Sequence, residues 1–310
     1  MKNSILVTGS SGLLGKAFQS KYNSENFIYF SSKDYNLLDE NKTNQLISKY
    51  KPEFVIHLAS KVGGVKSNID NMSDFFLNNI KINTNVLNAC HAHGVQKVIS
   101  LLSTCIYPDK VKYPLTENQI HNGPPHESNY GYAYSKRMLD IHTKVLRQQY
   151  GRNYICAIPN NLYGENDNFD LKNSHVIPAL IRKIYESKIN NKNVELWSDG
   201  SPLREFTYSK DISEILLFLL ENYNNDEPIN IGNTNEISIK ELAKKISNLL
   251  DYKGEIIWNT NMPSGQRRKP SCNKKLLELG WKKENYTSLD DGLKSTVNWF
   301  LKNYPNVRGI

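Results

Sequence analysis

Apolar and polar positions in the first half of the chain follow two spacings in turn. Short apolar runs, typical of buried strands, precede longer segments in which apolar residues recur with a helical period. Residues 4–22 predict a strand, a glycine turn and a helix, and residues 27–39 predict a second strand with its exit loop. The later predicted strands cover residues 54–60, 97–107 and 153–164, and the predicted helices cover 41–50, 75–94 and 132–151. This order is typical of βαβ units that build a parallel sheet with right-handed crossovers.

The pattern changes after Gly164. A polar stretch over 165–175 is followed by shorter segments: a helix from Val176 to about Ser187, short strands over 194–208, a helix over 211–223, a strand over 228–232 and amphipathic helices after Ser238. The pattern predicts the fold class α/β, with a Rossmann doubly wound parallel sheet and a smaller α/β substrate-binding domain. We expect residues 1–165 to form the Rossmann domain, with 207–232 returning to it. Residues 166–310 would mainly form the smaller domain, so that the two domains are interleaved.

Composition narrows the class of protein. Of the 310 residues, 39% are hydrophobic and 23% are charged, as in ordinary globular proteins. No apolar run approaches the roughly 18 residues that span a bilayer, and the N-terminal residues lack the pattern of a signal peptide. The cysteines Cys90, Cys105, Cys156 and Cys272 are far apart and form no CxxC pair, which favours reduced thiols in a cytoplasmic protein and no metal site.

The formal net charge of +8 is compatible with an anionic partner. Nucleic acid, an anionic membrane and a phosphorylated small molecule all belong to that class. The basic residues are spread along the chain, apart from the block Arg267 to Lys269, which indicates a solvated surface. We therefore expect neither a nucleic-acid nor a membrane partner.

A glycine-rich turn follows the first predicted strand and opens the first helix. Its GxxGxxG spacing allows the backbone to approach a pyrophosphate, while the helix N-terminus supplies amide donors. The strand–turn–helix context predicts a dinucleotide site made by Gly9, Ser10, Ser11, Gly12, Leu13, Leu14 and Gly15. NAD-specific sites usually carry Asp or Glu at the end of the second strand, whereas this chain has Ser31, Ser32 and Lys33 there. Hydroxyls and an ammonium suit a 2′-phosphate, so we expect NADP(H) as the cofactor.

Tyr132 and Lys136 stand at the YxxxK spacing, which places both on one helix face; Tyr134 is only two residues from the lysine. An ammonium beside a phenol is expected to lower its pKa from about 10. The phenol can then protonate a carbonyl oxygen as hydride reaches the carbon. Together with Ser103 at the end of a predicted strand, the sequence here resembles the extended short-chain dehydrogenase/reductase family. The resemblance implies that Ser103 holds the substrate carbonyl and that Tyr132 is the acid.

Cys105 has no use in hydride transfer alone. Family members that are 4,6-dehydratases carry Thr-Asp-Glu where this chain has Ser103-Thr104-Cys105, which argues against dehydration. A ketone acidifies the hydrogens on both neighbouring carbons, so an acid and a base on opposite faces can invert those carbons. Cysteine and histidine have suitable pKa values near neutral pH. His175, between the polar stretch and the next helix, is the predicted partner. From spacing alone, a buried small cysteine and a helix-entry histidine are the more usual interpretation.

Five segments carry a closer resemblance, over Ile5 to about Trp281: "KVGGVKSN", "STCIYP", "NGPPHESNYGYAYSKRM", "NLYGENDNFDLKNSHVIPALIRK" and "PLREF". They are similar to the GDP-4-keto-6-deoxymannose 3,5-epimerase/4-reductases within the extended family. This resemblance implies a homodimer that uses NADPH and forms GDP-L-fucose. It also implies that Cys105 and His175 invert carbons 3 and 5, and that Ser103, Tyr132 and Lys136 serve reduction at carbon 4.

The resemblance also implies contacts with cofactor and substrate. For the cofactor, the glycine-rich turn is joined by Ser32, Lys33, Asp39, Leu58, Ala59, Leu102, Ser103, Tyr132, Lys136, Pro159, Asn160, Asn161, Leu162 and His175. The family more often has Thr at the position of Asn160. For the substrate, the implied residues are Val65, Asn161, Lys183, Trp197, Arg204 and Arg267.

Two alternatives stay open at this point. One is a 4-reductase, with or without epimerisation, of a related GDP-4-keto sugar such as a GDP-4-keto-6-deoxy-heptose. The other is a non-catalytic Rossmann protein that senses dinucleotides, which could dispense with the Tyr–Lys pair.

Overall fold

The alternating strands and helices fold around a six-stranded, all-parallel sheet in the order β2-β1-β3-β4-β5-β9. The computed structural model describes residues 4–262 and 266–310. The strands of this sheet are β1 (Ile5–Thr8), β2 (Phe27–Phe30), β3 (Phe54–His57), β4 (Lys97–Leu101), β5 (Asn153–Pro159) and β9 (Ile229–Ile231). The predicted fold class, α/β with a Rossmann-like parallel sheet, is confirmed.

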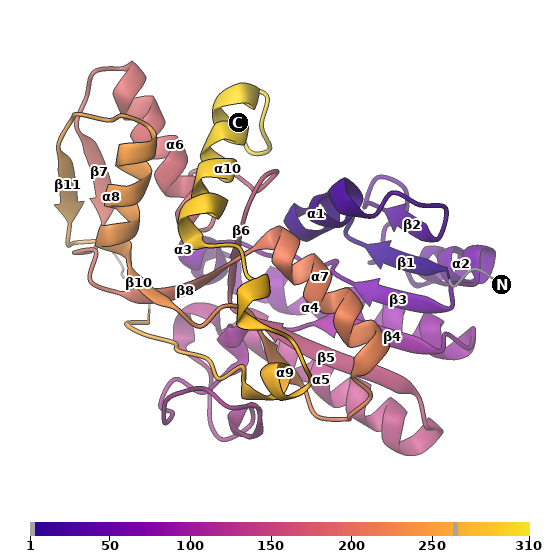
Figure 1. Cartoon of the computed structure of the whole chain (residues 1–310). Helices are drawn as coiled ribbons and strands as arrows, with labels where there is room; N and C mark the ends of the chain where they lie inside the picture. Colours follow the sequence, from indigo (N-terminus) through magenta and orange to yellow (C-terminus); the bar gives the residue numbers. More distant parts are fainter. Residues whose placement is uncertain (1–3, 263–265) are drawn as a thin grey trace.

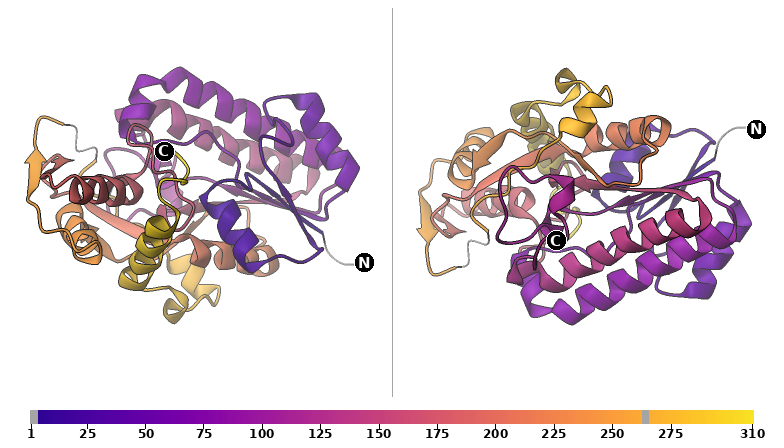
Figure 2. Two further views of the ribbon diagram at one scale, coloured as in Figure 1. Left: turned by 90° about the horizontal axis from the view of Figure 1, so that it is seen from above. Right: turned by 90° about the horizontal axis from the view of Figure 1, so that it is seen from below.

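Helices cover both faces of the sheet (Figures 1 and 2). One face is covered by α2 (Glu40–Tyr50), α4 (Met72–Ala92) and α5 (Tyr130–Tyr150), and the other by α1 (Leu13–Lys21), α7 (Ser209–Asn222) and α9 (Lys274–Glu278). Both α7 and β9 follow elements of the second lobe in the chain and pack with this sheet. The return of α9 was not predicted; Leu276 anchors it in the same core as α1 and α7.

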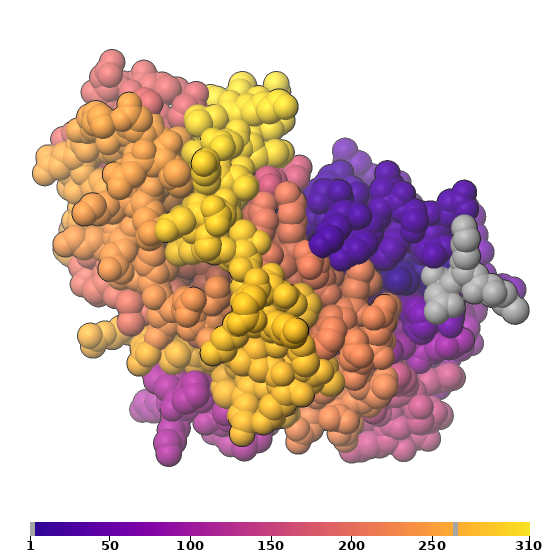
Figure 3. All heavy atoms as spheres, in the orientation of Figure 1, coloured from indigo at the N-terminus to yellow at the C-terminus, as the bar shows by residue number. Residues whose placement is uncertain are grey.

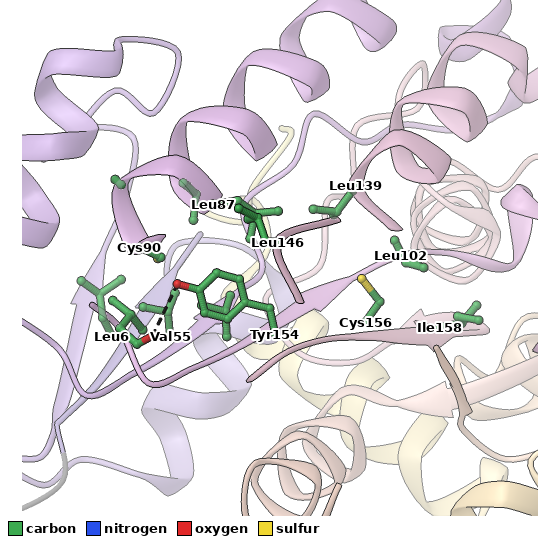
Figure 4. Packing of buried hydrophobic residues seen from close by; sticks show 14 of the residues in the cluster. Leu6, Val55, Leu87, Cys90, Leu102, Leu139, Leu146, Tyr154, Cys156 and Ile158 are labelled. Atoms are coloured by element: carbon green, nitrogen blue, oxygen red, sulfur yellow. Dashed lines mark hydrogen bonds between the residues drawn. The ribbon is translucent and has the colours of Figure 1, made fainter. Parts of the chain in front are cut away.

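Alternation along the strands divides the core between the two faces. In β5, Tyr154, Cys156 and Ile158 point to the α4–α5 side, and Figure 4 shows them in a row. Ile155 and Ala157 point to the α1–α7 side. Because successive side chains of a strand face opposite sides, a run with no polar residue is required where both faces are covered. None of the helices in the described ranges is both long and apolar enough to span a bilayer.

The second lobe holds two small sheets. The three-stranded sheet has the order β10-β8-β6, and the two-stranded sheet pairs β11 with β7 in parallel. Its elements are β6 (Asn161–Tyr163), α6 (Val176–Ile189), β7 (Val194–Trp197), β8 (Leu203–Tyr208), β10 (Glu236–Ser238), α8 (Ile239–Leu249), β11 (Ile256–Asn259) and α10 (Leu289–Asn303). A separate core unites α6, α8, α10 and the strands beside them.

Three segments differ from the sequence prediction. β4 ends at Leu101, and residues Thr104–Ile106 form a short 3-10 helix, η1, because the Ser103 Oγ accepts a hydrogen bond from the Cys105 amide. The predicted strand over 153–164 breaks at Asn160, so that β6 leaves the main sheet and pairs with β8. An additional short helix, α3 (Val65–Asp70), precedes α4. Further short 3-10 helices are η2 (Glu117–Gln119), η3 (Glu127–Asn129) and η4 (Lys283–Asn285).

Candidate active site

The glycine-rich turn packs tightly against the carboxyl end of β3. Gly9 has a positive φ of 71°, and a Cβ there would lie 2.9 Å from the Ala59 amide nitrogen. A Cβ on Gly15 would lie 2.3 Å from the Ser10 Cα, so α1 can approach the turn only with glycine at that position. β1 and β3 are neighbours while β2 lies on the other side of β1, which makes this edge the topological switch point of the sheet.

The N-terminus of α1 is free to bind an anion. Its N-cap residue is Gly12, no side chain caps the helix, and the first turn contains no acidic residue. The free amides and the helix dipole therefore suit a phosphate. Because Gly9 and Gly15 have no side chains, the turn can pack closely against its neighbours. These features fit a dinucleotide diphosphate.

The residues expected near the 2′-phosphate lie just beyond β2. Ser32 and Lys33 are exposed, and the Ser31 hydroxyl donates to Asp34 Oδ2 at 2.7 Å. The same hydrogen bonds lower the pKa of the Asp34 carboxyl. Asp39, an expected cofactor contact, is the N-cap of α2 and accepts from the Lys42 amide at 3.1 Å. Its contact with the cofactor stays a prediction.

Tyr132 and Lys136 lie on one face of α5 and meet the end of β4. The Lys136 ammonium donates to the Leu101 carbonyl at 2.7 Å and lies 5.9 Å from the centre of the Tyr132 ring. Burial lowers the pKa of Lys136 to about 8. The Tyr132 hydroxyl is hydrogen-bonded to Ser60 and Ser103, so phenol and serine lie together as the Ser–Tyr–Lys set requires. Tyr134 packs against Tyr130 instead.

The expected direction of the Tyr132 pKa is wrong. Burial, and secondarily the charge of Cys105, raises the pKa of Tyr132 well above its usual value, and the hydrogen bonds from Ser60 and Ser103 offset this only in part. Lys136 does not overcome burial because its ammonium is directed to the Leu101 carbonyl. Tyr132 is therefore a protonated phenol at neutral pH, which is the form a proton donor needs.

Cys105 lies beside this set, on η1. Its Sγ is 3.9 Å from the Lys269 ammonium, which donates to the sulfur, and its charge couples to both Tyr132 and Arg204. The sulfur thus faces the reducing centre.

His175 is the N-cap residue of α6, and its side chain is exposed to solvent. Desolvation lowers its pKa, and the positive charges of Lys269 and Arg308 lower it further. Lys269 thus donates to the Cys105 sulfur and lowers the pKa of His175. Cys105 and His175 are 70 residues apart in the sequence.

The residues expected to meet the substrate lie mostly on the second lobe. The Lys183 ammonium lies 5.0 Å from the centre of the Trp197 ring, and burial lowers its pKa. Arg204 donates to the carbonyls of Leu203 and Arg267, and burial lowers its pKa too. Val65 opens α3, and Arg267 is exposed; Ser264 and Gly265 of the motif around Arg267 lie outside the described residues.

The residues expected near the nicotinamide lie at the carboxyl ends of the central strands. Asn160 is buried, and both ends of its side chain bind protein groups: it donates to the Asn233 carbonyl at 2.7 Å and accepts from Thr207 at 2.7 Å. Only its backbone is left for a ligand. Asn161 donates to the Glu205 carbonyl at 2.8 Å. Of the other expected cofactor neighbours, Leu58, Ala59, Leu102 and Pro159 follow or end β3, β4 and β5, and Leu162 lies in β6. Their contacts with the cofactor stay predictions.

Three polar residues near the site were not singled out from the sequence. Ser60 follows β3 directly in the predicted strand "FVIHLAS", and Lys269 belongs to the only basic block. Arg308 lies near the C-terminus, far from every motif. The positions of Ser60 and Lys269 had a usable signal, a polar residue at a strand end and a charge cluster, whereas Arg308 had none.

The comparisons with known proteins bear on this geometry. The profile of the NAD dependent epimerase/dehydratase family matches residues 5–232. The chain belongs to this family. The extended short-chain dehydrogenase/reductase resemblance is thereby confirmed.

Individual relatives share nearly the whole chain. A GDP-L-fucose synthase from Dictyostelium discoideum is 41% identical over 99% of this chain and 98% of its own. A crystal structure of a GDP-L-fucose synthetase from Naegleria fowleri bound to NADP is 39% identical, with a TM-score of 0.91 over 99% of this chain and 96% of that one. A GDP-mannoheptose C4 reductase from Campylobacter jejuni with NADP bound is 28% identical, with a TM-score of 0.86 over 97% and 99%.

Proposed function

We propose that the protein epimerises carbons 3 and 5 of a GDP-4-keto-6-deoxy-hexose and reduces carbon 4 with NADPH, giving GDP-L-fucose. The observation that carries this proposal is the position of the Cys105 thiol. It lies beside the Tyr132 phenol and 3.9 Å from Lys269, the cation that also acts on His175. A site built only for hydride transfer would not need a thiol there. The similarity to GDP-L-fucose synthases along almost the whole chain supports the same activity.

The epimerisation uses the ketone of the substrate as its electron sink. One member of the Cys105/His175 pair removes the proton from carbon 3 or carbon 5, and the electron pair moves into an enolate at the carbon 4 oxygen. The other member returns a proton to the opposite face, which inverts the carbon. The lowered pKa of His175 keeps the imidazole neutral near pH 7, so it can accept a proton.

Reduction follows at carbon 4. NADPH, when bound, supplies the hydride. Tyr132 gives its proton to the ketone oxygen, and its raised pKa keeps that proton in place until the oxygen becomes negative. Ser103, hydrogen-bonded to Tyr132, is placed to hold the same oxygen, and Lys136 holds the local backbone through the Leu101 carbonyl. The Tyr132 phenolate is reprotonated from solvent through Ser60 or Ser103.

The preference for NADPH rests on the end of β2. Ser31, Ser32 and Lys33 present hydroxyls and an ammonium to the 2′-phosphate, and the nearby carboxylate of Asp34 is paired with Ser31. The similar NADP-bound structures support this preference. A kcat/KM with NADH equal to or greater than that with NADPH would contradict it.

A second candidate is reduction of a GDP-4-keto-6-deoxy-heptose, supported by the similarity to a GDP-mannoheptose C4 reductase. Incubation of the purified protein with NADPH and each keto sugar, followed by NMR of the product, separates the two. We expect GDP-L-fucose from the hexose. Turnover of the heptose alone would favour the second candidate. If NADPH is oxidised with neither the hexose nor the heptose, the result would favour a protein that only senses dinucleotides.

We propose a homodimer through the outer faces of α4 and α5. Leu77, Met138, Ile141 and Val145 are large apolar side chains exposed on these helices. A second copy of the same face would cover them by twofold symmetry. Light scattering during gel filtration should give twice the chain mass, and Ile141→Glu should halve it; a monomeric unsubstituted protein would contradict the dimer.

The proposed function also includes a division of the chain into two domains. We propose residues 1–165 with 207–232 as the cofactor domain and 166–310 as mainly the substrate domain, except that β6 and the end of β8 lie in the second lobe and α9 lies in the first. Limited proteolysis that releases a fragment cut within either unit would contradict this division.

A reduced Cys105 is required for the chemistry, which fits a cytoplasmic enzyme. An oxidised Cys105 in protein isolated from cells under alkylating conditions would contradict that location.

A further inference from the structure

The last residues of the chain return to the loop between β6 and α6. The Phe169 amide donates to the Arg308 carbonyl at 2.8 Å, and Arg182 donates to the Gly309 carbonyl at 3.0 Å. Val307 is buried in the core of the second lobe. A Cβ on Gly309 would lie 2.3 Å from Asn168 Oδ1. The backbone on both sides of Arg308 is therefore held in place.

The C-terminal helix α10 (yellow) lies on the side of the second lobe that faces the indigo N-terminal residues in the space-filling view (Figure 3). From this position the Arg308 side chain reaches the glycine-rich turn. Its Nη1 lies 4.0 Å from the point where a Cβ on Gly12 would be, and the Gly9 carbonyl oxygen lies 3.3 Å from the same point. The guanidinium thus faces the open side of the turn.

The charge of Arg308 has no fixed partner. Among residues 4–262 and 266–310, no hydrogen bond or ion pair of its guanidinium occurs. Its charge is nonetheless felt by two groups: it offsets part of the rise that burial causes in the pKa of Asp167, and it contributes to the lowered pKa of His175. The turn itself supplies no cation, since residues 9–15 contain no Lys or Arg. A diphosphate bound there would meet helix amides but no basic side chain of the turn.

We propose that Arg308 binds the diphosphate of the dinucleotide, so that the C-terminal segment forms part of the cofactor site. This inference rests on the proposed use of NADPH by the glycine-rich turn. A guanidinium matches phosphate oxygens by paired N–H donors, which makes arginine the usual residue for such a contact. Arg308 would then connect the cofactor with the loop that ends in His175, because its backbone carbonyl accepts a hydrogen bond from Phe169 in that loop.

The competing explanation is that Arg308 only anchors the tail to Asp167. Asp167 is buried, its Oδ1 accepts from the Asn168 amide at 2.7 Å, and its Oδ2 has no hydrogen-bond partner among the described residues. Burial raises the pKa of Asp167 to about 7. An anchoring role predicts that Asp167→Asn has the same effect as loss of Arg308. A diphosphate contact predicts that it does not.

The test is cofactor affinity, measured by calorimetry on the full chain without sugar. Arg308→Ala should weaken NADPH binding about tenfold or more, equivalent to about 1.4 kcal/mol. Arg308→Lys should restore part of the affinity, and the control Lys302→Ala, near the end of α10, should leave it unchanged. Adenosine 2′-monophosphate, which lacks the diphosphate, should bind all variants equally.

Two results overturn the proposal. One is an NADPH affinity of Arg308→Ala within twofold of that of the unsubstituted protein. The other is an equal loss for NADPH and adenosine 2′-monophosphate together with a lower melting temperature, which Asp167→Asn reproduces. Because no sugar is present, failure of the proposed function is seen separately: the unsubstituted protein would bind NADPH but reduce no GDP-4-keto sugar.

Discussion

Burial rather than charge decides the protonation of the central phenol. The YxxxK spacing correctly brings Tyr132 and Lys136 to one helix face, but the sequence cannot give the dielectric surroundings of either. Lys136 is 3% exposed and donates to a backbone carbonyl, so its charge is used to hold β4. The phenol keeps its proton, as an acid must.

His57 illustrates the same rule away from the chemistry. It is buried at the end of β3, its Nδ1 pairs with Thr8 and its Nε2 with Asn83. Burial, and then the charge of Lys136, lowers its pKa to about 3, while the Asn83 contact opposes this. The folded-state pKa of His57 is below that of the unfolded chain. The contribution of neutral His57 to the free energy of unfolding is therefore complete above the unfolded pKa of about 6.5, and it is lost as the pH falls toward 3.

We therefore predict an acid-dependent loss of stability that His57 causes. Between pH 6.5 and pH 4.5 the free energy of unfolding should fall by up to about 1.4 kcal/mol per pH unit from this residue alone. His57→Gln should be less stable at pH 7 but show a smaller decrease with acid. Urea unfolding at both pH values measures the difference. Equal decreases for the two proteins would contradict the assignment.

The order of elements could be predicted from the sequence because it depends on local patterns. The strand–turn–helix around Gly12, and the alternation of strand-like with helix-like apolar patterns, depend only on residues close together in the sequence. The break at Asn160 could not be predicted, because it depends on hydrogen bonds to Thr207 and Asn233, which are 47 and 73 positions away. The end of β4 is similar: a continuous apolar run gives no sign that the Ser103 hydroxyl will turn the backbone into η1.

At the scale of an element, α1 depends on Gly15. The crowding atom, the Ser10 Cα, belongs to the backbone and cannot rotate away, so Gly15→Ala must displace α1 from the turn. We expect at least about a tenfold loss of NADPH affinity, because the helix amides leave the diphosphate position. Gly94→Ala is the control: its φ of 70° is also positive, but nothing lies within 4 Å. It should lose stability of about 1 kcal/mol and keep its affinity. Equal affinity in both variants would contradict the tight turn.

At the scale of the whole molecule, the candidate site contains residues from both lobes. Cys105 and Tyr132 belong to the sheet lobe, His175 opens the first helix of the second lobe, and Lys269 lies in the segment that returns to the sheet. The sequence motifs indicated the first three residues, since each stands in a segment similar to a known family. The basic block marks Lys269 in the sequence, but its position beside Cys105 depends on where distant segments meet.

The two halves of the proposed reaction can be separated in one measurement. Tyr132→Phe and Cys105→Ser are each incubated with GDP-4-keto-6-deoxymannose and NADPH in D₂O, and deuterium at carbons 3 and 5 is followed by NMR. Tyr132→Phe should incorporate deuterium but oxidise NADPH at least about a hundredfold more slowly than the unsubstituted protein, and Cys105→Ser should lose incorporation by a similar factor. Undiminished incorporation by Cys105→Ser, or none by the unsubstituted protein, would contradict a site in which sulfur and phenol act in turn on one sugar ketone.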